Sequence, residues 1–277
     1  VTALIKLENI QKGEFSKLKA KTIVIRNNIK KAYIENAIIT NKKLTLYSDN
    51  IEIDANQKLA KCYPYPKIKT PFLEAKATTF EINYSQNTLM GTNEVDIFLK
   101  NNGAKIKSDY MLFYIDKDRL ELKENVKISQ KGKFSTAEKL EYDNSTGQIV
   151  LRNNVKTIIE KGSAFLREDT IKKIRNAETK KILQSGIFVS CDNFYMNSVN
   201  GDATAEGSVL ILQKNNRAKS DNAFFAENSE TLTLNGNVYV EKNKQWLKTQ
   251  KIIASLSKEE FEAVGNVQSE IKIKRKR

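Results

Sequence analysis

A short phrase, in which Asn or Gly closely precedes Val, returns along the chain at a nearly constant interval, as in Leu234–Val240. The valines of its copies are Val95, Val126, Val155, Val209, Val238 and Val267. Successive valines are 31, 29, 54, 29 and 29 residues apart, and 54 is nearly two periods. Such a period is typical of a supersecondary unit that cannot bury its apolar face alone and stacks on copies of itself. The chain is therefore predicted to be a solenoid or a rolled sheet.

A second phrase lies between the valines, with Ser, Thr or Lys followed by Asp or Ala and then an alternating apolar run, as in Ser108–Tyr114 and Ser135–Tyr142. Alternation of apolar residues is the pattern of a half-buried strand, so each repeat is predicted to contain two strands. Turn-forming clusters such as Asn101–Gly103 favour short connections and antiparallel pairing. We expect more than half of the residues to be strand, in one roll with the valines at 126, 155, 238 and 267 stacked on one another.

Two stretches depart from the repeat. Residues 167–178 are rich in charge and have apolar residues at roughly helical spacing, which indicates a short surface helix or a long polar hairpin. A repeat copy is expected close by, at Ser163–Leu166 with Ile182 and Leu183. Pro64, Pro66 and Pro71 fall within eight residues. Because proline cannot donate to a sheet ladder, this stretch is interpreted as an irregular join, with a domain boundary as the alternative.

The residue types present argue against enzymatic chemistry. The 277 residues include no histidine and only two cysteines, Cys62 and Cys191. His-based catalysis is therefore excluded, and a zinc site lacks ligands. The cysteines lie several repeats apart, so we expect buried thiols that are not bonded to each other. Carboxylate pairs such as Glu259–Glu260 fall in expected turns, and no phosphate-binding or nucleophile motif is present. We predict no enzyme, no cofactor and no metal.

The net charge of +14 predicts an anionic partner, either nucleic acid or acidic lipid headgroups, unless the excess reflects composition alone. Nucleic acid is disfavoured because the aromatic residues occupy alternation positions expected to face a core. The basic residues 272–277 are read as a solvated tail. The chain has no run of 18 apolar residues. It begins at Val1, so an export signal or anchor is presumed to have been removed.

The alternation of an Asn/Gly-Asn-Val strand with a Ser/Thr-x-Ala/Asp strand ending in Tyr resembles the OstA-like (LptA/LptC) family of periplasmic lipopolysaccharide-transport proteins. The best matches are Leu234–Val240 and Ser135–Tyr142. The resemblance divides the chain into LptC-like units (1–62), a proline-containing join (63–72), LptA-like repeats (73–271) and the tail (272–277), as one continuous body. It implies an all-β, elongated antiparallel β-jellyroll, a rolled and V-shaped sheet with an apolar interior.

The same resemblance implies a periplasmic bridge that binds lipopolysaccharide or a related glycolipid in an apolar groove and passes it toward the outer membrane. The implied partners are the glycolipid, other jellyroll components of the export machinery at the inner and outer membranes, and further copies of the chain joined end to end through unpaired edge strands. The residues expected to line the groove are Phe113, Leu122, Leu140, Tyr142, Leu151, Phe194, Leu210, Phe224, Leu232 and Leu234.

Two other readings of the residues remain open. A passive β-solenoid, serving as a scaffold or filament, would fill its interior with uniformly large side chains. A polyanion-binding surface module would instead depend on the positive charge alone. Small residues at inward or near-inward positions favour free space inside, and hence the lipid-binding reading. These small residues are Ala205, Gly207, Ala223, Gly236, Ala263 and Gly265.

Overall fold

The computed structural model describes residues 2–3, 17–26, 30–161, 185–255, 258 and 260–270, which are strands joined by turns without a helix. The chain divides into two compact units. Unit 1 comprises Val1–Gln130 and Lys139–Ser145, and unit 2 comprises Lys131–Glu138 and Thr146–Arg277. The stretch 167–178 and the repeat copy expected around 163–166, 182 and 183 lie outside the described residues.

Unit 1 combines short strands with two strands of ten residues, Lys31–Thr40 and Thr45–Asp54, and with long strands after residue 87. The strands are β1 (Thr2–Ala3), β2 (Lys17–Lys19), β3 (Thr22–Arg26), β4 (Lys31–Thr40), β5 (Thr45–Asp54), β6 (Leu59–Tyr63), β7 (Lys67–Lys69), β8 (Leu73–Lys76), β9 (Thr79–Asn83), β10 (Thr88–Leu99), β11 (Lys105–Tyr114) and β12 (Arg119–Gln130). Strand β13 (Lys133–Asp143) contributes residues to both units.

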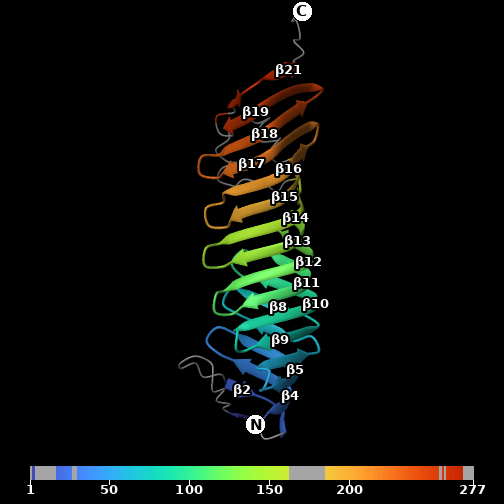
Figure 1. The fold of residues 1–277 in the computed structure, drawn as a ribbon, viewed down its shortest axis with the longest axis vertical. Helices are drawn as coiled ribbons and strands as arrows, with labels where there is room; N and C mark the ends of the chain where they lie inside the picture. The colour runs from blue at the N-terminus through green and yellow to red at the C-terminus, as the bar shows by residue number, and fades with distance from the viewer. Residues whose placement is uncertain are drawn as a thin grey trace, which may run out of the picture. The chain divides into compact units, whose positions relative to one another are not determined.

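Unit 2 continues with strands of similar length. They are β14 (Gln148–Ile159), β15 (Ile187–Asn197), β16 (Ala203–Gln213), β17 (Asn216–Ala226), β18 (Thr231–Lys242), β19 (Gln245–Ser255), β20 (Glu260–Val264) and β21 (Gln268–Glu270). Each of the strands β14 to β18 pairs antiparallel with the next one in the chain, as the ribbon in Figure 1 shows. The expected all-β antiparallel class is therefore confirmed.

Each long strand has two halves, which we call arms, and short strands pair with one arm at a time. Strand β10 pairs with β9 along its first arm and with β8 along its second. Strand β5 is shared in the same way by β6 and β7, and β19 by β20 and β21. Pro64 and Pro66 lie between β6 and β7, and Pro71 lies between β7 and β8. Pro64 and Pro66 therefore occupy a break between arms, and Pro71 lies in the turn of the β7–β8 hairpin, so that no proline has to donate to a ladder.

A bulge separates the two arms in every second strand of the repeat. The register shifts by one residue between Thr92 and Val95 of β10, and in the same way before Val155 of β14 and Val238 of β18. The two residues before each valine have positive φ, as at Asn153 (62°) and Asn154 (54°). Asparagine and glycine adopt this left-handed conformation most readily, and a bulge bends the strand that carries it. The recurring phrase of the sequence is thus the corner of the roll.

The recurring valines are buried at this corner, with one exception. Val126, Val155 and Val238 are 1–2% exposed, but Val267 is 51% exposed, in the turn between the short strands β20 and β21. The valines also do not touch one another in the expected stack. A smaller residue on the intervening strand separates them, because Val95 pairs with Ser108 and Val238 pairs with Thr249.

The core of unit 1 is filled by its own side chains. Phe72 contacts Phe113 edge to face, with ring centroids 5.9 Å apart, and lies 6.4 Å from the ring of Tyr142. The Tyr142 hydroxyl accepts a hydrogen bond from the Asn101 amide at 2.9 Å and donates one to Asn144 at 3.0 Å. A buried phenol needs such partners, so these bonds fix the ring at the edge of the core.

Candidate functional site

We call the side of the sheet that carries the buried valines the inner face, and the inner face of unit 2 is the candidate functional surface. We call the arm that precedes the bulge in β14, β16 and β18, with the residues paired to it, the leucine arm. The leucine arm contributes two rows of side chains to the inner face. The row nearest the bulges follows the register Leu151, Phe194, Ala205, Ala223, Leu234 and Ile252. Its members are between 3% and 7% exposed, except for Phe194, which is partly exposed. This row therefore forms the closed base of the inner face.

The second row of the leucine arm lies farther from the bulges and is more open. It follows the register Ile149, Met196, Ala203, Phe225, Leu232 and Ala254. Ile149, Met196, Leu232 and Ala254 are partly exposed. Burial of these apolar side chains thus decreases with distance from the bulges.

The other arm, which we call the valine arm, presents an apolar row that is open along its length. The row follows the register Thr157, Val189, Ile211, Ala218, Val240 and Leu247. All six residues are partly exposed. The apolar surface of this row is in contact with solvent, and a ligand can cover it. This favours binding of an apolar chain.

Unit 1 differs from unit 2 at the equivalent positions. Met111, Phe113, Leu120, Leu122 and Leu140 are 0–1% exposed, so their side chains are packed against one another. In unit 2, by contrast, several large inward side chains keep part of their surface accessible, namely Phe194, Met196 and Leu232. The inner face of unit 2 therefore has accessible apolar surface at these positions, while the equivalent side chains of unit 1 are buried.

The structure separates the residues that the sequence predicted to line a groove. Those packed inside unit 1 are Phe113, Leu122, Leu140 and Tyr142. Those on the inner face of unit 2 are Leu151, Phe194, Leu232 and Leu234. The remaining two, Leu210 and Phe224, do not face inward.

Phe224 was expected to face inward, and this prediction is wrong. Its neighbours Ala223 and Phe225 are 7% and 4% exposed and take the two inward positions, whereas Phe224 is 43% exposed on the opposite face. Leu210 likewise lies on the outer face, because its neighbour Val209 is 2% exposed and takes the inward position. Leu210 pairs with the exposed Lys219. Two adjacent strand residues cannot share a face, and the sequence offered apolar candidates at both positions.

The small residues expected to leave free space have two different roles. Ala205 and Ala223 lie in the inward row nearest the bulges, as expected. The expected glycines lie in the bulges before Val209, Val238 and Val267, with φ between 77° and 82°. Their role is thus in the backbone bend, whereas these two alanines occupy inward positions.

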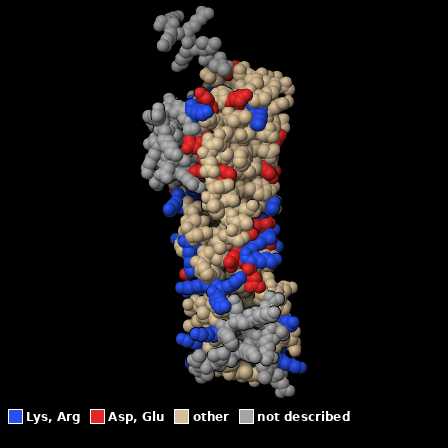
Figure 2. All heavy atoms as spheres, turned by 90° about the vertical axis from the view of Figure 1, so that its left-hand side faces the viewer, with Lys and Arg blue, Asp and Glu red and all other residues tan. Residues whose placement is uncertain are grey.

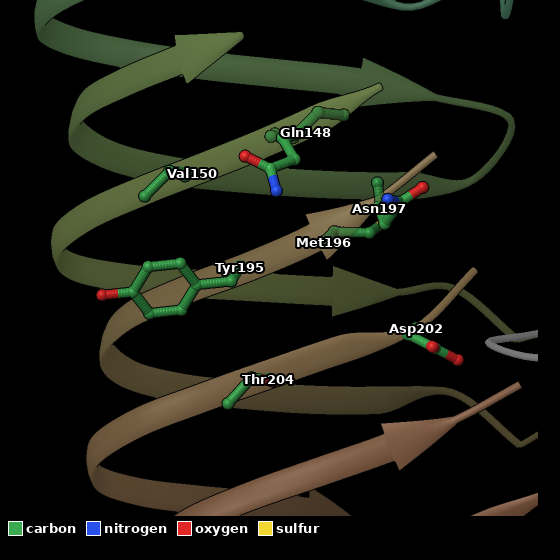
Figure 3. Close-up of a pocket in the computed structure, with 8 residues that line it drawn as sticks. Gln148, Val150, Tyr195, Met196, Asn197, Asp202 and Thr204 are labelled. Carbon is green, nitrogen blue, oxygen red and sulfur yellow. The ribbon is translucent and has the colours of Figure 1, made fainter. Parts of the chain in front are cut away.

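A small hollow lies in unit 2 over neighbouring ends of β14, β15 and β16. Its volume is about 220 Å³, and it is lined by Gln148, Ile149, Val150, Tyr195, Met196, Asn197, Asp202 and Thr204, as Figure 3 shows. The Arg152 guanidinium lies 5.7 Å from the Tyr195 ring centroid beside it. This volume is below the roughly 300–1,000 Å³ of typical small-molecule sites. The hollow is therefore too small to hold an acyl chain with its headgroup.

Several charged side chains of unit 1 form ion pairs at its surface. Lys76 and Lys107 both lie within 4 Å of Asp96, at 3.2 and 3.8 Å, and Arg119 reaches Glu121 and Glu141. Figure 2 shows Lys and Arg side chains beside Asp and Glu on one face of the molecule. Such exposed pairs contribute little to stability, but they compensate much of the positive charge locally.

The two thiols are free and buried, as predicted. Cys62 lies in β6 and Cys191 in β15, at 0% and 5% exposure. Burial raises the pKa of Cys62 to about 12 and that of Cys191 to about 11. A protonated, enclosed thiol is a poor nucleophile, so neither cysteine is suited to catalysis. The described residues contain no group of three or more potential metal ligands.

Sequence reasoning missed the contact that joins the two recurring phrases. Glu138 of β13 accepts hydrogen bonds from the side-chain amides of Asn153 at 3.1 Å and Asn154 at 2.6 Å. Asp109 of β11 accepts one from Asn125 in the same way. The sequence does contain a signal for this contact, because an acidic residue of the second phrase recurs at a nearly fixed distance before the asparagine of the next first phrase. This contact is structural and holds the inner face in place.

Three comparisons with known proteins bear on this arrangement. Residues 77–160 match the family described as lipopolysaccharide-assembly, LptC-related. A similar solved structure is LptH, the LptA homologous periplasmic component of the conserved lipopolysaccharide transport device from Pseudomonas aeruginosa. The alignment has 10% identity and a TM-score of 0.37, and it covers 42% of this chain and 94% of LptH. No curated protein sequence matches the chain. Among the residues that the structure describes, no helix is long and apolar enough to span a membrane.

Proposed function

We propose that the chain is a periplasmic lipid-transport protein, because residues 77–160 match the LptC-related lipopolysaccharide-assembly family, in agreement with the resemblance seen in the sequence. It binds lipopolysaccharide or a related glycolipid on the apolar inner face of unit 2 and passes it toward the outer membrane. Other jellyroll components of the same export machinery, or further copies of the chain, receive the lipid through edge-strand pairing.

The observation that carries this proposal is the partial exposure of an apolar inner face. The valine-arm row is open along its whole length, while the base of the leucine arm is buried. An acyl chain that covers this row gains roughly 0.8 kcal/mol for each methylene removed from water. A dozen methylenes contribute on the order of 10 kcal/mol before the entropic cost of binding. This is enough for capture without any covalent step.

The uniformity of the row suits transport as well as binding. Val189, Ile211, Ala218, Val240 and Leu247 offer aliphatic surfaces on the consecutive strands β15 to β19. Strands are about 4.8 Å apart, so a chain that moves by one strand meets nearly the same surface. Its binding energy therefore changes little during movement, and the barrier to sliding stays low.

Site-specific photo-crosslinking in cells tests this function. A benzoylphenylalanine at Phe194 or Leu232, on the inner face, is expected to trap a glycolipid. The matched control is Phe224, an aromatic residue of the same unit that is 43% exposed on the outer face. Labelling at the two inward positions that clearly exceeds labelling at Phe224 supports the proposal. Equal labelling at all three, or none, contradicts it and leaves the passive scaffold as the better reading.

A further inference from the structure

Three lysines form a basic edge beside the open apolar row of unit 2. Lys214 lies in the turn between β16 and β17, Lys242 ends β18, and Lys244 lies in the turn between β18 and β19. We call Lys214, Lys242 and Lys244 the basic lip. All three are exposed. They mark the end of the valine arm that is farthest from the bulges.

The strand register ties the basic lip to the apolar row. Asn216 pairs with Lys242, and two residues further along the same strands Ala218 pairs with Val240. Residues two apart in a strand share a face and are about 7 Å apart. Lys242 is therefore the next position after Val240 on the inner face. An amphiphile that covers Val240 with its chain places its headgroup at this lysine.

The charges of the basic lip are not compensated by neighbouring acids. Among the described residues, no ion pair or side-chain hydrogen bond involves the ammonium group of Lys214, Lys242 or Lys244, in contrast to the paired Lys76, Lys100 and Lys139. The nearest acid in register, Glu241, lies on the opposite face of β18 from Lys242, pairs with Arg217 and accepts a hydrogen bond from Tyr239 at 3.1 Å. Within the described part of the chain, the lip thus presents ammonium groups without an acidic partner.

The far end of the leucine arm carries the opposite charge. Asp202, Glu227 and Glu230 lie in the turns between β15 and β16 and between β17 and β18. Lys258 is a cation at that end and lies near Glu260. These acids disfavour an anionic headgroup at this end of the leucine arm, which leaves the basic lip as the favoured edge.

Building on the proposed lipid-transport function, we propose that the basic lip binds the phosphate groups of a phosphorylated glycolipid whose acyl chain covers the valine-arm row. Lysine ammonium groups bind phosphate as point charges with three donors each. Asn215, Asn216 and Asn243 add neutral amides between the lysines. The bound headgroup stays in water at the lip, while the chain is removed from it.

Equilibrium binding of two matched glycolipids to the full chain tests this assignment. The probes are an acylated disaccharide that carries two phosphates and the same molecule after enzymatic dephosphorylation. The lip variant is Lys214→Gln/Lys242→Gln/Lys244→Gln. The control variant is Lys156→Gln/Lys219→Gln/Lys251→Gln, which removes the same charge from outward positions of the same unit.

The lip variant is expected to bind the phosphorylated probe at least tenfold more weakly than the wild type and the dephosphorylated probe within twofold. The control variant should bind both probes as the wild type does. Equal affinity of the lip and control variants for the phosphorylated probe overturns the assignment but leaves the lipid-binding function intact. If millimolar inorganic phosphate displaces the probe, the basic lip is a site for free anions, and the assignment to a glycolipid headgroup is overturned. A wild-type chain that binds neither probe contradicts the function itself.

Discussion

The Asp221 carboxylate of β17 accepts a hydrogen bond at 2.9 Å from the side-chain amide of Asn237, which lies in the bulge of β18. The same relationship joins Glu138 to Asn153 and Asn154, and Asp109 to Asn125. The acidic residue always comes from one recurring phrase and the asparagine from the other. The two phrases are therefore the two halves of one contact that holds the strand in its bent form.

Replacing a bulge glycine should destabilise unit 2 more than the backbone conformation alone explains. Gly236 has φ of 77°, and a Cβ there would meet the Asp221 side chain, with Cγ at 2.9 Å. Gly103 has a similar φ of 72°, but a Cβ there meets nothing within 4 Å. We expect Gly103→Ala to cost about 1 kcal/mol of unfolding free energy and Gly236→Ala about 2–3 kcal/mol. Urea unfolding measures both, and equal losses would contradict the close contact.

The Asp221–Asn237 contact should appear as a coupling energy. In a double-mutant cycle of Asp221→Ala and Asn237→Ala, we expect about 0.5–1.5 kcal/mol of coupling, because one hydrogen bond at a solvent-accessible site is lost. The control cycle combines Asp221→Ala with Asn153→Ala, whose partner is Glu138. Those two changes should be additive. Coupling in the control cycle, or none in the test cycle, speaks against the contact.

Phe113 and Phe224 should respond very differently to truncation. Phe113 is 1% exposed and contacts Phe72, whereas Phe224 is 43% exposed. Phe113→Ala is expected to lower the unfolding free energy by about 3–5 kcal/mol through cavity formation. Phe224→Ala should cost below about 1 kcal/mol. Thermal unfolding followed by circular dichroism compares them, and similar losses would show that Phe224 is part of the core.

Both thiols should resist alkylation in the folded protein. Burial raises the pKa of Cys62 to about 12 and that of Cys191 to about 11, so at pH 8 both are protonated as well as enclosed. Intact-mass measurement after iodoacetamide treatment should show no adduct under native conditions and two adducts in 6 M guanidinium, a concentration chosen to unfold the chain. Rapid native labelling of either thiol would contradict its burial. Migration on a gel should be the same with and without reductant.

The sequence was sufficient to predict the antiparallel strands, because alternation and turn residues are local signals. The recurring Asn and Gly residues also mark where each strand bends, but the sequence alone does not show that they form a bulge. Asn153 and Asn154, for example, look like turn residues inside an apolar run. Two left-handed residues in mid-strand specify a bulge, and this bulge changes which face the next residues occupy. Counting alternation across it, or choosing between adjacent residues such as Phe224 and Phe225, therefore fails without the register.

The contrast between the two inner faces could not be predicted from alternation. Phe72 lies in a turn outside the repeat phrases, yet it packs against Phe113 and Tyr142 and helps to close the core of unit 1. The openness of the valine-arm row in unit 2 likewise depends on what packs opposite it. Both features follow from contacts between distant segments, which a single strand pattern does not encode.

The alternation of bulged and unbulged strands limits how such a chain can change in length during evolution. A bulged strand such as β16 has its extra residue accommodated by unbulged partners on both sides, β15 and β17. Insertion of one strand would place two bulged or two unbulged strands side by side and would leave an acid or an asparagine without its counterpart. Duplication or loss of a whole hairpin preserves every contact. Homologues of this chain should therefore differ in length by steps of about two strands.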